Sequence, residues 1–141
     1  MKSKSMLLIM SIFTLSLNMM ACHHECGTPA VSTYYASVTI FDEVIGINTQ
    51  IFNFTQTQKS YAQGDCSPLT SSTNLEITNL TPYTASYEYT ITYNLNLVSW
   101  QKQGSVIIAP QATINVGEIN ESGARIDLGQ IIVTYSNVSY R

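Results

Sequence analysis

Four consecutive residues near the N-terminus have side chains that bind metals: His23, His24, Glu25 and Cys26. Imidazole, carboxylate and thiolate groups are common ligands of zinc and copper. The chain contains only these two histidines, and neighbouring side chains in an extended segment point in opposite directions. We therefore predict no metal site and no other cofactor, and interpret these residues as a polar tether. Metal binding through His23 and His24 is the alternative.

Carboxylates offer a second possible chemistry, because a pair of them can cleave a glycosidic bond. A Ser–His–Asp triad needs a histidine that the fold has placed, and both histidines lie next to Cys22. Isolated acids on a β domain are usually solvated charges, so we predict that the chain is not an enzyme. The alternative is a small envelope enzyme that uses acids from the set Glu76, Glu88, Glu118, Glu121 and Asp127.

The N-terminus has the pattern of an export signal. Lys2 and Lys4 are followed by a mostly apolar run over residues 6–20. At about 15 residues this run is shorter than a membrane span and fits the apolar region of a signal peptide. Ala21 then precedes Cys22. This arrangement resembles the lipobox of bacterial lipoproteins.

The lipobox resemblance implies that the signal peptide, residues 1–21, is removed and that Cys22 carries lipid, palmitate included. Cys22 would then fix the protein to a membrane of the cell envelope. His23, and not Asp, follows the cysteine, which by the same resemblance favours the outer membrane. The alternative is an ordinary secretory signal with Cys22 as a free thiol.

The two remaining cysteines, Cys26 and Cys66, form an even pair. Exported proteins meet an oxidising environment, in which such a pair predicts a disulfide bond. The bond would close a loop of about 40 residues and contribute about 4 kcal/mol in the loop-entropy account.

The charged residues exclude several classes of partner. Beyond Cys22 the basic residues are Lys59, Lys102, Arg125 and Arg141, against nine acids in the whole chain. Nucleic-acid binding needs clustered Lys and Arg, and docking on anionic lipid headgroups needs a basic patch. We therefore expect a polar surface of Thr, Asn, Ser, Gln and Tyr, without nucleic acid as a partner.

The elements that must position these residues are β-strands. Residues 83–98 alternate strictly, with Tyr87, Tyr89, Ile91 and Tyr93 on one side and polar residues on the other. That period predicts a half-buried antiparallel strand, and its length predicts a bend or a bulge. Shorter strands are expected over residues 34–41, 45–55, 74–80, 105–109, 112–119 and 127–140, with turns at residues 42–43 and 101–104.

About seven strands separated by turn signals predict an all-β fold, an antiparallel two-sheet sandwich over residues 31–141, behind a lipidated tether of residues 22–30. A small β-barrel is the alternative. The order of Asn79, the long alternating strand, Gly104 and Pro110 resembles bacterial immunoglobulin-like domains. The resemblance implies a sandwich architecture and leaves the ligand open.

Aromatic residues are the remaining candidates for a contact surface. The tyrosines that share a face with Ile91 are expected in the core, whereas Tyr35 and Trp100 are candidate binding residues. Together these features predict a membrane-anchored envelope lipoprotein that acts as a non-catalytic binding or structural module. Its partner would be another envelope component, either a protein or a glycan.

Overall fold

Seven strands form two antiparallel sheets in the computed structural model, which describes residues 27–61, 70–121 and 123–141. The four-stranded sheet has the order β1 (Ala30–Asp42), β2 (Ile47–Ser60), β3 (Thr70–Asn79) and β6 (Thr113–Glu118). The three-stranded sheet has the order β5 (Val98–Ile108), β4 (Ala85–Leu95) and β7 (Ile132–Tyr140), and a short 3-10 helix, η1 (Leu128–Gln130), precedes β7.

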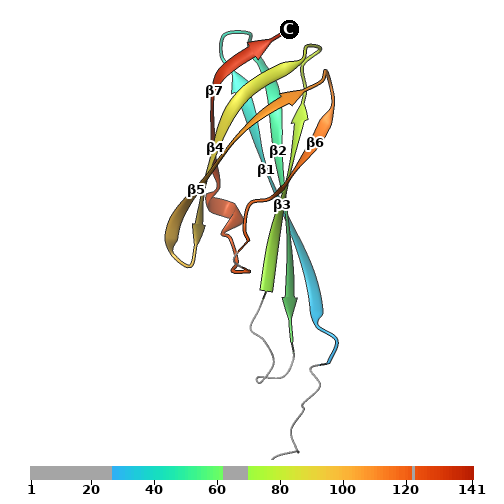
Figure 1. Ribbon diagram of the computed structural model, residues 1–141, viewed down its shortest axis with the longest axis vertical. Coiled ribbons are helices and arrows are strands. Elements are labelled where there is room, and N and C mark those ends of the chain that lie inside the picture. The colour runs from blue at the N-terminus through green and yellow to red at the C-terminus, as the bar shows by residue number, and fades with distance from the viewer. Residues whose placement is uncertain (1–26, 62–69, 122) are drawn as a thin grey trace, which may run out of the picture.

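The two sheets face each other and are not joined into a barrel (Figure 1). The predicted sandwich is therefore confirmed, and the barrel alternative is wrong. The four-stranded sheet runs past the three-stranded sheet at the end where β1 begins (Figure 1). We call this end of the molecule the open end.

The strand order differs from that of immunoglobulin constant domains. In those domains the third strand crosses to the second sheet, whereas here β1, β2 and β3 are successive neighbours in one sheet. The first crossing follows β3, and β6 later returns to pair with it. The chain thus shares the two-layer architecture with immunoglobulin domains but not their connectivity.

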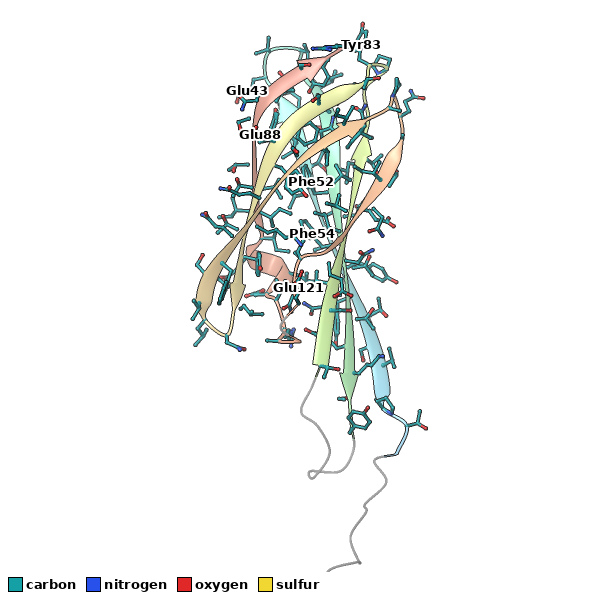
Figure 2. All side chains as sticks on the ribbon, viewed as in Figure 1. Glu43, Phe52, Phe54, Tyr83, Glu88 and Glu121 are labelled. Carbon is teal, nitrogen blue, oxygen red and sulfur yellow. The ribbon has the colours of Figure 1, made fainter. Side chains whose placement is uncertain are left out.

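The core lies between the sheets and is built from alternate residues of the central strands. Phe52 and Phe54 of β2 are almost completely buried and point toward the opposite sheet (Figure 2). The ring of Phe52 meets that of Tyr89 at 5.9 Å in a near-perpendicular arrangement, which aromatic pairs favour. Other buried members of this core include Leu75, Ile77, Ala85, Tyr87, Ile91, Tyr93, Leu95 and Ile108.

The long alternating segment contains both a confirmed and a wrong prediction. Tyr87, Tyr89 and Tyr93 are buried as expected, whereas Tyr83, before the start of β4, is exposed. The pairing of β4 with β7 shifts register between Ser86 and Glu88, which confirms the expected bulge. The segment is not one strand, however, because β4 ends at Leu95 and β5 begins at Val98. The turn expected at residues 101–104 lies inside β5, and the real turn is formed by Asn96 and Leu97.

One amide joins four parts of the sandwich at the end opposite the open end. The side chain of Asn79 is fully buried. Its Nδ2 donates to the carbonyl oxygens of Tyr83, Ile108 and Ala109, at 2.7, 3.2 and 3.0 Å. Its Oδ1 accepts from Gln50 Nε2 and from the amide and hydroxyl of Thr81. Asn79 therefore connects β2, β3, the turn after β3 and the end of β5.

Candidate functional site

The segment that connects β6 to β7 fills the open end of the sandwich. This crossover segment, residues 119–131 with residue 122 outside the described part, buries Ile119 and Ile126. Ile126 forms a β-bridge with Leu95 of the three-stranded sheet. On the other side, the amide of Ser71 donates to the carbonyl of Gly123 at 2.8 Å. The segment therefore touches both sheets and separates their ends.

The four-stranded sheet meets the crossover segment with polar side chains. Gln56 is 1% exposed, and its Nε2 donates to Ile126 O at 3.0 Å and to Thr73 Oγ1 at 3.2 Å. Gln58 Nε2 donates to Gln56 Oε1 at 2.6 Å. A buried amide is stable only where it is hydrogen-bonded, so this polar row fixes the segment by its backbone.

A cleft of about 310 Å³ lies between the crossover segment and the edge strand β5. Trp100 is opposite Tyr93 in the β4–β5 register, on the side of the sheet that faces the crossover segment, and it is 52% exposed. Lys102 donates from Nζ to the carbonyl of Glu118. We call this the Trp100 cleft, and its lining is Tyr93, Leu95, Trp100, Gln101, Lys102, Ile119, Asn120 and Glu121.

The electrostatics of the Trp100 cleft favour a protonated phenol beside its carboxylate. Burial raises the pKa of Tyr93, and the nearby charge of Glu121 raises it further. Tyr93 therefore stays neutral at physiological pH and can act as a hydrogen-bond donor. The cleft combines an exposed aromatic ring with amide, ammonium, phenol and carboxylate groups.

The second candidate residue, Tyr35, lies in the edge strand β1 of the four-stranded sheet. It borders a smaller depression of about 240 Å³ together with Tyr34, Arg125 and Asp127. The guanidinium carbon of Arg125 lies 5.8 Å from the ring centre of Tyr34, a cation–π distance. Tyr35 itself is 76% exposed. The structure thus places Tyr35 and Trp100 in separate depressions, one beside β1 and the other beside β5.

The acids considered for catalysis are not gathered into one site. Glu88 projects from β4 on the outer face of the three-stranded sheet (Figure 2) and accepts from Asn137 Nδ2 at 2.8 Å. Glu118 ends β6 and Glu76 lies in β3, both in the four-stranded sheet. Glu121 lines the Trp100 cleft, whereas Asp127 lines the depressions around Arg125. Across the described residues, His, Cys, Asp and Glu nowhere gather in threes that could hold a metal ion.

The N-terminal candidates lie outside the described residues. These are the signal peptide, the lipidation site Cys22, the metal alternative His23 and His24, and both partners of the predicted disulfide, Cys26 and Cys66. Within the part of the chain that is described, no helix has the length and apolarity to cross a membrane.

Sequence reasoning missed the residues that complete the Trp100 cleft. Ile119, Asn120 and Glu121 follow β6 directly, and no local pattern shows that they pack beside a strand nearly 20 positions earlier. Comparison with protein-family models, with curated proteins and with solved structures finds no match to this chain.

Proposed function

We propose that this chain is a cell-envelope lipoprotein, anchored through Cys22, whose sandwich domain is a non-catalytic binding module. The observation that carries the proposal is the half-exposed Trp100 in its cleft. A large aromatic side chain that is 52% exposed gives up much of the free energy that its burial would contribute. Recognition of a partner is a reason to keep it at the surface.

The chemistry of the Trp100 cleft suits a glycan of the envelope. Aromatic rings stack on the apolar faces of sugars, side-chain amides both donate to and accept from sugar hydroxyls, and carboxylates accept from them. Lys102, Asn120 and Glu121 supply polar groups to the same cleft as Trp100. A protein partner is the other class, because Trp is enriched at the energetic centres of protein interfaces.

Tryptophan fluorescence tests the binding proposal directly, because Trp100 is the only tryptophan in the chain. Titration of the mature protein with soluble peptidoglycan fragments should shift and saturate the emission. Glu121→Ala should weaken the apparent affinity by about tenfold, the effect of a lost hydrogen bond of about 1.4 kcal/mol. Tyr35→Ala is the matched control, since Tyr35 lies outside this cleft.

The emission should not stay unchanged when the glycan fragments are added. If it does, and if the protein captures one envelope protein in a way that Trp100→Ala abolishes, the cleft binds a protein and not a glycan. Turnover of an envelope substrate that is lost on replacing Glu88 and Glu118 together would contradict the non-catalytic proposal.

The anchor is tested separately by mass spectrometry of the protein purified from its native envelope. The N-terminus should be Cys22 with acyl mass attached, and Cys22→Ser should abolish both the acylation and the cleavage at this site. The protein should fractionate with the outer membrane. An unmodified N-terminus at another residue would contradict the lipoprotein assignment.

A further inference from the structure

β1 is the outermost strand of the four-stranded sheet, and its free edge is long and regular. It pairs with β2 from Ala30 to Ile40 without a register shift, and the first irregularity falls between Ile40 and Phe41. Residues 30–35 are exposed on both faces, because this half of the strand lies at the open end (Figure 1). An edge strand presents unpaired N–H and C=O groups that can bind another strand.

The other three edges carry features that disfavour strand addition. β6 is only six residues long and its pairing with β3 shifts register between Leu75 and Glu76. β5 carries Lys102 on its core-facing side. β7 is bulged opposite residues 86–88, and Asn137 within it has a φ of 56°. Short strands, bulges and inward-pointing charges are the usual protections of sheet edges, and β1 lacks all three from Ala30 to Ile40.

We propose that β1 pairs antiparallel with β1 of a second copy of this chain, across a twofold axis at Thr33. The choice of a second copy follows from charge: residues 30–41 contain no ionisable acid or base other than tyrosine. A twofold axis brings a surface against itself, so a charged edge would repel its own copy, whereas this neutral one does not.

The exposed part of β1 fixes the register. A pair centred on Thr33 uses residues 30–36 of each copy, which is the half that extends past the three-stranded sheet. Val31 then lies opposite Tyr35 of the second copy on the outer face, and Ser32 lies opposite Tyr34. Cross-strand pairs of a β-branched residue with an aromatic one are favourable.

The register is tested by cysteine crosslinking of the mature protein in detergent. Thr33→Cys places two thiols directly opposite each other at the axis, within the reach of a disulfide bond. Thr57→Cys is the matched control, because Thr57 is the β2 partner of Thr33 and is enclosed within the sheet. Mild oxidation should give at least about tenfold more disulfide-linked dimer from Thr33→Cys than from Thr57→Cys, a difference of about 1.4 kcal/mol in effective association.

The second experiment introduces a charge at the twofold axis and measures the mass of the protein in detergent. Thr33→Lys should convert a dimeric detergent-corrected mass into a monomeric one, since like charges directly opposite destabilise strand pairing, while the circular dichroism spectrum stays that of the parent. A monomeric parent, equal crosslinking of the two cysteine variants, or crosslinking of Thr33→Cys to a different envelope protein would overturn the proposal.

Discussion

Both polar atoms of the buried Asn79 side chain are hydrogen-bonded, so replacing this residue should cost much free energy of unfolding. Replacing it with Ala removes an acceptor from Gln50 and Thr81 and leaves the carbonyls of Tyr83, Ile108 and Ala109 without its donor. Leaving buried polar groups unpaired costs about 1–3 kcal/mol for each group, so Asn79→Ala should lower the free energy of unfolding by about 3 kcal/mol or more. Urea denaturation measures it, with Asn53→Ala on the outer side of β2 as the control, and equal stabilities of the two variants would contradict it.

The ring of Tyr89 occupies the space where a side chain at position 104 would lie, so this position needs glycine. The two residues are opposite each other in the β4–β5 register, and a Cβ at Gly104 would approach the phenol ring of Tyr89 to under 3.0 Å. That ring is held against Phe52 in the core. We expect Gly104→Ala to cost about 1–3 kcal/mol, typical of overpacking.

The same Gly104→Ala change in a Tyr89→Leu background should cost much less, since the ring that it meets is gone. A double-mutant cycle by thermal denaturation checks this coupling. Strictly additive effects would show that the space above Gly104 is not the reason for the glycine.

At the scale of elements, the β4–β5 turn carries a strained residue. Asn96 and Leu97 have φ values of 51° and 65°, a left-handed pair that two-residue hairpin turns favour with Asn-Gly. Leu97 is completely exposed, so its side chain contributes nothing to the core. Leu97→Gly should therefore raise the free energy of unfolding by about 1 kcal/mol through relief of the left-handed strain.

Chemical denaturation measures this gain, and Val98→Gly is the control, because Val98 lies in regular β5. There a glycine is expected to destabilise. A loss of stability in Leu97→Gly would mean that the leucine supports the hairpin by a contact of its own.

The same turn explains how far the sequence could predict the elements. Alternation identified the buried side of β4 because this strand is central, with one face in the core. It failed at the turn because Leu97 continues the apolar period and no glycine marks the reversal. The pattern of β5 is weaker, since β5 is an edge strand and buries only Val106 and Ile108 among its residues.

At the scale of the whole molecule, buried phenols make the fold sensitive to alkali. Burial raises the pKa values of Tyr87 and Tyr89 in the folded state, and for Tyr87 the neighbouring Tyr140 and Tyr89 add to the shift. When the pKa of a group is higher in the folded state than its unfolded value of about 10, its contribution to the free energy of unfolding is fully present below about pH 10. The contribution is lost progressively as the pH rises from about 10 toward the folded-state pKa. We expect the free energy of unfolding to fall above about pH 10.

Urea denaturation at pH 9 and pH 11 measures this fall. Tyr89→Phe should reduce it, because one buried phenol is removed, whereas Tyr35→Phe removes an exposed phenol and serves as the control. An identical pH dependence in the parent and in Tyr89→Phe would exclude this tyrosine as a cause.

The Trp100 cleft is formed by segments that are distant in the sequence, and that is why the sequence predicted only part of it. Trp100 could be selected as the single tryptophan of a strand-rich chain. Its cleft exists only because the crossover segment returns from β6 to the open end and docks on Gln56 and Leu95. Such a long-range arrangement leaves no periodic signal, and Arg125 over Tyr34 is unpredictable for the same reason.

The burial of Asn79 also has a consequence for the choice of a host in which to produce this protein. Asn79, Leu80 and Thr81 form an acceptor sequence for N-glycosylation, which a eukaryotic secretory pathway would modify while the chain is still unfolded. The amide nitrogen that would carry the sugar is the one that donates to Tyr83, Ile108 and Ala109. A glycosylated chain could not close the sandwich, whereas a sugar at Asn53, on the outer side of β2, could be carried by the folded domain. Hosts that do not glycosylate are therefore the ones suited to producing it.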